Sequence, residues 1–267
     1  MTREMKELNL KEIHEILLDI LLDVDDFCRE RNLRYSLSYG TLLGAVRHKG
    51  YIPWDDDVDL MMPRPDFERF VATYGQRGPY NCLYMENSDR GQFIQCYAKV
   101  QDIRTVSIER KRSNVYRFGL NLDIFPVDVA PADAALHETF AKTVTRFRHR
   151  IYLSQRPFFP FTFHDPLIPK IQAHRHSPLW WAQQCEEYLK QYAASDSPYA
   201  GPVSDGMGTV EIFRQSLFAD YVTLPFEGHR LQAIADWETF LVQMYGDYMT
   251  LPPENKRRTH GLTAWWK

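Results

Sequence analysis

The chain opens with a long stretch in which apolar residues recur at every third or fourth position. Between residues 9 and 31 they form one continuous stripe, made up of Ile13, Ile16, Leu17, Ile20, Leu21, Val24, Phe27 and Cys28. Charged side chains fill most of the remaining positions, so one face suits a core and the other suits water. This spacing predicts an amphipathic helix over about residues 9–31.

A different pattern follows, with apolar and polar residues alternating over residues 33–39 and 57–62. Alternation of this kind is typical of strands with one buried face. Short strands are also predicted near residues 82–85, 93–100 and 120–125. The sequence up to about residue 130 therefore combines helices with a set of short strands.

Helical spacing dominates the second half of the chain. We predict helices over about residues 132–149 and 229–245, separated by a loop rich in Pro and Phe at 157–168 and a connector at 193–209. Together the two halves predict an α+β fold with a mainly helical C-terminal half. We expect a catalytic core over residues 1–130, and a mainly helical region over 131–267 that packs on it and completes the active site.

Composition narrows the range of functions. The 267 residues carry a net charge of −3, which lacks the basic excess expected of a nucleic-acid-binding protein. The four cysteines form no Cys-x-x-Cys pair, and the N-terminal residues are charged without an apolar signal region. No stretch reaches the roughly 20 apolar residues needed to cross a bilayer. We therefore expect a cytoplasmic protein.

An acidic run at residues 55–59 is the sharpest local feature. If Asp57 and Asp59 lie on one strand, their side chains project from the same face, about 6–7 Å apart. Two carboxylates this close repel each other, and a divalent cation relieves the repulsion. Carboxylate oxygens suit Mg²⁺ or Mn²⁺, and Mg²⁺ is commonly shared with substrate phosphates. The pattern predicts a metal site at Asp57 and Asp59.

A third acid lies within another predicted strand. Asp123 is flanked by Leu122 and Ile124, which would share the buried face and leave the carboxylate on the other. A lone acid in an apolar strand is unfavourable without a partner or a function. If this strand neighbours the first, Asp57, Asp59 and Asp123 converge. The alternative is that all three acids are simply solvated.

Gly40 and Thr41 stand where a predicted strand meets a short helix. Glycine permits close approach of a phosphate to the backbone, the helix N-terminus supplies N–H donors, and the Thr41 hydroxyl adds another. An ordinary helix cap has the same residues. Arg47 lies at the far end of the short helix and could reach an anionic donor.

The segment from Ser38 to Asp59 closely resembles the LicD family of phosphocholine transferases, and residues 121–128 and 245–260 resemble it as well. The resemblance implies a nucleotidyltransferase-like fold of the polymerase-β type, a mixed sheet flanked by helices. It implies that Asp57 and Asp59 are the paired metal ligands and that Asp123 is the third acid. It also implies a donor such as CDP-choline and a sugar acceptor on a cell-surface glycan or lipopolysaccharide precursor.

Further candidate substrate-binding residues follow from this interpretation: Trp54 beside the acids, Lys99 on a strand of the same region, and Arg258 and His260 from the C-terminal tail. An aromatic ring such as that of Trp54 could contact a quaternary ammonium. Lys99 and Arg258 could equally be ordinary surface residues. Phe158, Phe159, Phe161 and Phe163 prompt the hypothesis that the Pro-rich loop contacts a lipid-linked acceptor at the membrane.

Two alternatives stay open. The same fold could transfer a nucleoside monophosphate to a small molecule, releasing pyrophosphate instead of CMP. It could also serve as a nucleotide-binding protein without catalysis, although retention of all three acids favours an enzyme. CDP-ethanolamine, CDP-ribitol and CDP-glycerol are further candidate donors.

Overall fold

The computed structural model of the chain describes residues 6–85, 94–111, 114–159 and 167–267, with the backbone alone for 109–111 and 114–117. The chain forms two compact units. The first comprises Met1–Leu83, Lys99–Phe125 and Ser216–Lys267, and the second comprises Tyr84–Ala98 and Pro126–Gln215. The C-terminal segment thus belongs to the unit with the first strands, whereas the sequence interpretation grouped it with residues 131–215.

Helix α1 spans Leu10–Arg31, which confirms the prediction. Asn9 and Glu12 form a reciprocal capping box at its start, and Asn32 ends it in the left-handed conformation. Its apolar stripe is buried, and the Phe27 ring meets the Phe70 ring of helix α3 (Arg64–Thr73) edge-on at 5.4 Å. The helix is therefore fixed by its caps and by packing in the first unit.

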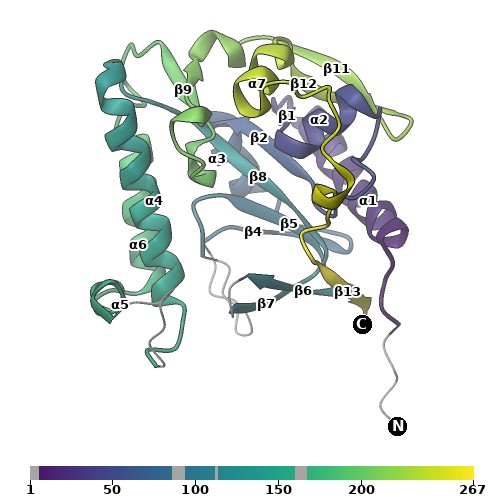
Figure 1. The fold of residues 1–267 in the computed structure, drawn as a ribbon, viewed down its shortest axis with the longest axis horizontal. Coiled ribbons are helices and arrows are strands. Elements are labelled where there is room, and N and C mark those ends of the chain that lie inside the picture. Colours follow the sequence, from purple (N-terminus) through teal and green to yellow (C-terminus); the bar gives the residue numbers. More distant parts are fainter. Residues whose placement is uncertain (1–5, 86–93, 112–113, 160–166) are drawn as a thin grey trace. The chain divides into compact units, whose positions relative to one another are not determined.

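The sheet of the first unit runs in the order β1-β2-β8-β5-β4-β3 (Figure 1). Its members are β1 (Ser36–Leu37), β2 (Asp59–Pro63), β3 (Gln76–Arg77), β4 (Tyr80–Leu83), β5 (Ala98–Asp102) and β8 (Asn121–Val129). Strands β1 and β2 are antiparallel, with Ser36 opposite Met61. These strands and the helices confirm an α+β chain. Strand β2 begins at Asp59, so the expectation that Asp57 lies on that strand is wrong.

Two helices and a hairpin complete the surroundings of this sheet. Helix α2 (Tyr39–Arg47) directly follows β1, and helix α3 (Arg64–Thr73) directly follows β2. Strands β11 (Tyr221–Phe226) and β12 (His229–Ile234) form an antiparallel hairpin, followed by helix α7 (Trp237–Tyr245). The predicted helix over 229–245 is thus wrong for its first half, because Leu231, Ala233 and Ile234 are buried on a strand.

A small second sheet of the first unit was not predicted. Its strands are β6 (Thr105–Lys111), β7 (Asn114–Phe118) and the C-terminal β13 (Thr263–Trp266), in the order β13-β6-β7. Because β13 pairs with β6, the residues just before it are fixed to the first unit. This pairing determines where the tail segment 254–262 can lie.

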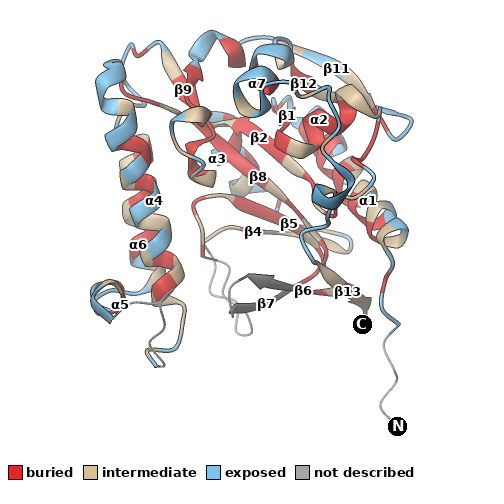
Figure 2. Ribbon diagram, viewed as in Figure 1, coloured by how far each residue is buried: buried red, intermediate tan, exposed pale blue. Residues whose placement is uncertain are grey.

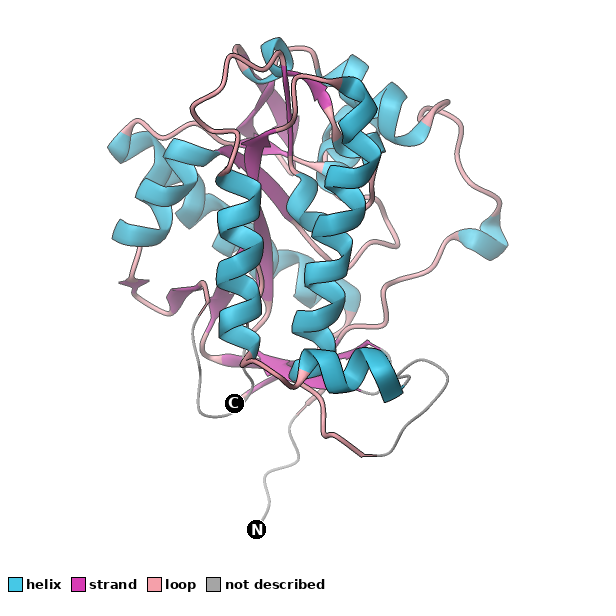
Figure 3. Cartoon of the chain, turned by 90° about the vertical axis from the view of Figure 1, so that its left-hand side faces the viewer, coloured by secondary structure: helices cyan, strands magenta, loops and turns pink. Residues whose placement is uncertain are grey.

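The second unit is mainly helical. It contains α4 (His137–Ser154), α5 (Leu167–Ala173) and α6 (Pro178–Lys190), with β9 (Tyr199–Gly201) and β10 (Phe213–Arg214). Helices α4 and α6 pack along each other, and α5 lies across one end of the pair (Figure 3). The facing residues of α4 and α6, among them Phe140, Val144, Trp181 and Cys185, are buried (Figure 2). The helix predicted over 132–149 is confirmed as α4.

Short 3₁₀ helices link these elements, at Ala134–Leu136, Val203–Asp205, Thr209–Glu211, Gln215–Phe218 and Glu254–Lys256. Within the described residues, no helix has both the length and the apolar character needed to cross a membrane.

Candidate active site

The backbone of Asp59, the first residue of β2, forms hydrogen bonds with two residues near the junction between β1 and α2. Its N–H donates to Thr41 Oγ1 at 2.8 Å, and its carbonyl accepts from the Ser38 N–H at 2.9 Å. Thr41 is buried in the first turn of α2. The Thr41 hydroxyl oxygen therefore positions the acidic segment.

Gly40 makes room for a neighbouring carboxylate. A Cβ atom added at Gly40 would lie 2.7 Å from Oδ2 of Asp55, a distance that real side chains do not tolerate. The sequence predicted that Gly40 allows a phosphate to approach the backbone. The structure places the Asp55 side chain against this glycine. The Asp55 carbonyl also lies 2.6 Å from Nε2 of His14, whose ring stacks on that of Tyr51. Asp55 is thus fixed through both its backbone and its side chain.

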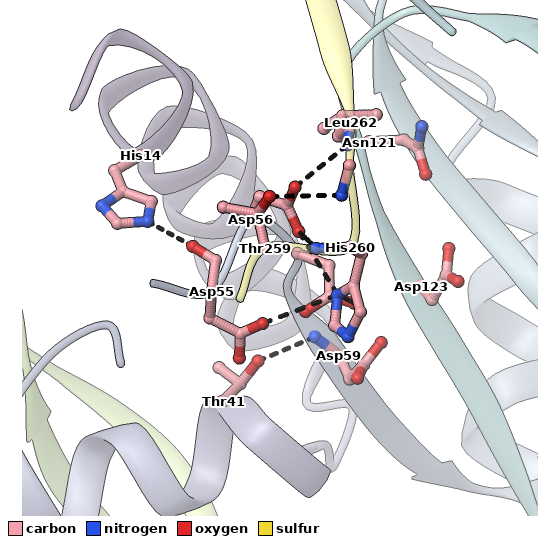
Figure 4. Close-up of polar contacts among 12 residues, drawn as sticks. His14, Thr41, Asp55, Asp56, Asp59, Asn121, Asp123, Thr259, His260 and Leu262 are labelled. Carbon is pink, nitrogen blue, oxygen red and sulfur yellow. Dashed lines mark hydrogen bonds and ion pairs between the residues drawn. The ribbon is translucent and has the colours of Figure 1, made fainter. Parts of the chain in front are cut away.

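Asp56 anchors the C-terminal tail. Its buried carboxylate accepts the backbone N–H of His260 at 2.9 Å and that of Leu262 at 3.1 Å. These contacts join two segments about two hundred positions apart in the sequence. They bring the His260 ring beside the acidic run, as Figure 4 shows.

The His260 imidazole lies among three carboxylates. Its Nδ1 atom is 2.9 Å from Oδ2 of Asp57, 3.3 Å from Oδ1 of Asp56 and 3.6 Å from Oδ1 of Asp55. Hydrogen bonds to Asp56 and Asp57 raise the pKa of His260 to about 11, although partial burial opposes the shift. In the absence of a cation, the imidazolium therefore balances the negative charge of this segment.

The pKa values of Asp55 and Asp56 are shifted in opposite directions. Burial and the nearby Asp57 carboxylate raise the pKa of Asp55 to about 7. Burial acts in the same direction on Asp56, but its hydrogen bonds from His260 and Leu262 outweigh it and lower the Asp56 pKa. Asp56 therefore anchors the tail as a carboxylate, whereas the environment of Asp55 disfavours its charged form. A cation close to Asp55 would stabilise its ionised form.

Asp59 and Asp123 project from the neighbouring strands β2 and β8. The Asp123 N–H donates to the Val58 carbonyl at 2.9 Å, and the flanking Leu60 and Leu122 are buried on the opposite face. Figure 4 shows the Asp59 and Asp123 side chains on the side of the strands where the His260 ring lies. The carboxylate at 123 is therefore not separated from the acidic segment by the sheet.

Lys99 on β5 forms an ion pair with Asp123. Its buried ammonium group donates to Oδ1 of Asp123 and, at 2.8 Å, to Oδ1 of Asn121. The prediction placed Lys99 in this region as a phosphate ligand. In the structure the Lys99 ammonium group is ion-paired with the Asp123 carboxylate.

The residues fit a divalent cation at one point of this arrangement. Asp55, Asp57 and His260 each offer a ligand atom, and these atoms all lie within 4.8 Å of one another. Carboxylate oxygens suit Mg²⁺ or Mn²⁺, whereas an imidazole nitrogen is a less usual ligand for Mg²⁺. An ion that used His260 would also have to displace its proton. The group overlaps the predicted ligands only at Asp57.

Two guanidinium groups, those of Arg47 and Arg257, lie close enough to affect each other, and Arg257 stands over Trp54, just before the acidic run. Arg47 Nη1 donates to the Tyr248 carbonyl at 2.7 Å, and Arg257 Nε donates to the Pro252 carbonyl at 2.9 Å. The Arg257 guanidinium also stands 5.2 Å from the centre of the Trp54 ring. Burial and the charge of Arg257 lower the pKa of Arg47. Among the described residues, neither arginine pairs with a carboxylate, so their positive charge is available to an anion.

Arg258, the tail arginine chosen from the sequence, is exposed and donates to the Asn255 carbonyl at 3.1 Å. Arg257 is the one that reaches Trp54. The sequence offers no signal that distinguishes these adjacent arginines. Asp55 was likewise not chosen as a metal ligand, because a strand pattern pairs residues 57 and 59 and leaves the loop before them unassigned.

Glu227 fixes the loop that leads into the acidic run. Its Oε1 atom accepts the Tyr51 N–H at 3.0 Å, and its own N–H donates to the Lys49 carbonyl at 2.9 Å. A Cβ atom at Gly50 would come within 1.9 Å of this carboxylate. Glu227 is therefore a positioning residue, supplied by the hairpin turn between β11 and β12.

Comparison with known proteins is consistent with the resemblance read from the motifs. The family described as LicD/FKTN/FKRP, nucleotidyltransferase domain, matches residues 32–166. The lipopolysaccharide cholinephosphotransferase LicD of Haemophilus influenzae is 30% identical over 265 residues, covering 97% of this chain and 98% of that protein. The chain belongs to the LicD family.

Shorter matches involve uncharacterised proteins of two Rickettsia species. The protein of Rickettsia typhi is 33% identical over 92 residues, which is 32% of this chain and 30% of the relative. That of Rickettsia prowazekii is 31% identical over 103 residues, which is 32% of this chain and 39% of the relative. The similarity therefore extends along nearly the whole chain for the Haemophilus protein and along about a third of it for the two Rickettsia proteins.

Proposed function

We propose that this LicD family member transfers phosphocholine from CDP-choline to a sugar hydroxyl of a lipopolysaccharide or related glycan precursor. The observation that carries the proposal is the near full-length similarity to a lipopolysaccharide cholinephosphotransferase, together with the group of Asp55, Asp57 and His260 just before β2. Such a reaction needs a site that binds a diphosphate and activates a hydroxyl. The described residues supply groups for both tasks.

We propose that Asp57 and Asp59, with Asp123 nearby, hold Mg²⁺ or Mn²⁺, and that Asp55 and His260 contribute to the same site. When bound, the ion neutralises phosphate charge and stabilises the leaving nucleotide. The chain's own part is to keep these groups in place: Thr41 fixes the backbone of Asp59, and Asp56 fixes the tail that carries His260. Such preorganisation is what positions a reacting phosphate.

The arginines are suited to the donor's diphosphate. Arg47 and Arg257 lie close enough for one charge to affect the other, and both donate only to neutral groups among the described contacts. A diphosphate would supply the negative charge that these guanidinium groups lack. The Trp54 ring beneath Arg257 orients that side chain through a cation–π contact. Gly40 contributes by admitting Asp55, and Arg258 stays a candidate at the rim.

In the proposed reaction, the acceptor hydroxyl oxygen attacks the phosphorus that carries choline. The bond from this phosphorus to the bridging oxygen breaks, and CMP leaves with the electron pair. We assign the acceptance of the hydroxyl proton to Asp123, whose side chain lies on the same side of the strands as those of Asp59 and His260 (Figure 4). The product is a phosphodiester between choline and the sugar.

We further propose that the first unit adopts the nucleotidyltransferase-like fold named in the family description, and that the second unit helps to bind the acceptor. The protein would act in the cytoplasm, with peripheral contact at the inner face of the membrane. This location suits a lipid-linked sugar acceptor.

Thermal-shift measurements test the proposed donor. CDP-choline, CDP-ethanolamine, CDP-ribitol, CDP-glycerol and CTP would each be added with Mg²⁺ or Mn²⁺, because a ligand that binds the native state raises the melting temperature. We expect the largest rise with CDP-choline and a divalent cation. Preferential stabilisation by CTP, followed by pyrophosphate release with an acceptor, would support nucleotide transfer instead.

A further inference from the structure

The short helix α5 of the second unit has an inverted polarity. Leu167, Ile168 and Ile171 are 47%, 68% and 42% exposed, whereas Lys170 on the same helix is only 1% exposed. A helix on a water-facing surface normally buries its apolar residues and exposes its lysines. The outward face of α5 is therefore suited to an apolar medium.

Two aromatic residues extend this surface at the same end of the helical pair. Phe159 follows α4 and is 67% exposed, and Trp180 in the first turn of α6 is 36% exposed. We call Phe159, Leu167, Ile168, Ile171 and Trp180 the apolar patch. Residues 160–166 lie outside the described part of the chain and are not included. Figure 2 shows the exposed colour over α5, where three members of the patch lie.

The charge of the surrounding sequence is strongly asymmetric. Residues 139–185 contain seven Lys or Arg and one acid, Asp165, in a chain whose net charge is −3. By sequence this segment carries about six positive charges (seven minus one), but Lys170 is buried, Lys142 pairs with Glu138 and Arg148 with Asp205, so fewer of them are at the surface as unbalanced charge. His174, Arg175 and His176 are exposed in the link between α5 and α6, directly beside the patch.

We propose that the apolar patch and its basic surroundings dock the protein on an anionic phospholipid bilayer. Apolar and aromatic side chains enter the interface, and Lys and Arg attract the negatively charged headgroups. The charge argues against a second copy of the chain as the occupant, because a symmetric contact would place the same basic segment on both sides. The surface would hold the protein where a lipid-linked acceptor is found, and it deepens the proposed membrane contact.

Vesicle cosedimentation tests the proposal. The intact protein is mixed with vesicles of phosphatidylcholine alone, or of an equal mixture of phosphatidylcholine and phosphatidylglycerol. We expect binding to the mixed vesicles that falls as salt is added, and at least about tenfold weaker binding to the neutral ones. Equal binding to both vesicles, or no binding to either, would overturn the proposal.

The variant Leu167→Ser/Ile168→Ser/Ile171→Ser removes the apolar face of α5 while leaving the buried Lys170 and Ala173 in place. We expect about a tenfold loss of binding to the mixed vesicles, because the interfacial contribution scales with apolar area. Leu136→Ser is the matched control: Leu136 is 46% exposed, beside the opposite end of α4, and its loss should leave binding unchanged. Unaltered binding by the triple variant would contradict the assignment.

The charge contribution is tested separately with Arg175→Glu, which should weaken binding to mixed vesicles only. Sedimentation velocity of the intact protein tests whether the patch instead binds a second copy of the chain. A dimer that the triple variant abolishes would assign the patch to self-association. Transfer from CDP-choline to a water-soluble acceptor should be unchanged in all these variants. Failure of the docking surface is thus distinguishable from failure of the proposed phosphocholine transfer.

Discussion

The acidic segment of the first unit and the apolar patch of the second use opposite kinds of interaction. Around Asp57, the acidic segment is held by specific hydrogen bonds and ion pairs, among them those of Asp56 and His260. The apolar patch is defined by exposed apolar side chains, and its contribution depends on area and charge. The contrast separates chemistry, which requires directional contacts, from docking, which does not. Changes in one region should therefore leave the function of the other intact.

The largest expected effect comes from Asp57→Asn. Asp57 contacts His260 and belongs to the group that fits a cation, so its loss should lower metal-dependent transfer by more than about 100-fold. The melting temperature should stay the same or rise, because repulsion between neighbouring carboxylates is relieved. Steady-state transfer and calorimetry measure the two quantities. Asp196→Asn, at an exposed position of the second unit, is the control.

Substantial transfer by Asp57→Asn would remove this residue from the site. If transfer is lost and vesicle binding persists, the separation between chemistry and docking is supported.

A large effect on stability is expected from Lys99→Met. The substitution leaves Asp123 without its cation, and breaking a largely buried ion pair costs about 3 kcal/mol of unfolding free energy. The double variant Lys99→Met/Asp123→Leu should recover much of that stability but none of the transfer. Denaturant unfolding and activity assays would follow both. A double variant that regained transfer would show that Asp123 has a structural role alone.

A smaller effect should follow from Gly40→Ala. The new methyl group would press on the Asp55 carboxylate, which must then move. We expect about a tenfold fall in transfer, comparable to the effect of displacing a supporting contact at a metal site. Gly75→Ala provides the comparison at a glycine with free space but positive φ, where backbone strain would lower stability without altering transfer.

The smallest expected effect is that of Glu227→Ala. Loss of the acceptor for the Tyr51 N–H should cost about 1–2 kcal/mol of stability. Glu227→Gln keeps a carbonyl acceptor and should be close to the parent protein. Unfolding midpoints measured in parallel would decide between them. Equal destabilisation by the two variants would mean that the charge of Glu227 matters more than this hydrogen bond.

Local patterns in the sequence were enough to predict several elements and misled at others. The stripe ending at Cys28 predicted α1 because its three- and four-residue spacing matches one buried face of a helix. The hairpin after Phe226 was missed, although Glu227 and Gly228 mark a turn between alternating residues. A single helical interpretation of 229–245 overrode that signal. Tertiary pairing of the two strands, which local spacing does not encode, decides the outcome.

At the candidate site too, local sequence patterns identify residues but not the contacts between distant segments. Asp57, Asp59 and Asp123 could be selected because a charged side chain within an apolar strand pattern is unfavourable unless it has a partner or a function. His260 was selected as a tail residue of the site, but its contacts with the acids could not be predicted, because they depend on hydrogen bonds from the tail to Asp56 and on pairing of β13 with β6. These contacts are distant in sequence, and their register is fixed only in the folded chain.

The most direct test of the central claim is a product analysis with choline-labelled CDP-choline and a lipopolysaccharide acceptor. The intact protein would be assayed with Mg²⁺ or Mn²⁺ and again with the cation removed by a chelator. The account predicts one CMP released for each phosphocholine found on the acceptor, and no turnover after chelation. Full turnover without a divalent cation, or an acceptor that carries CMP while phosphocholine is released, would contradict it.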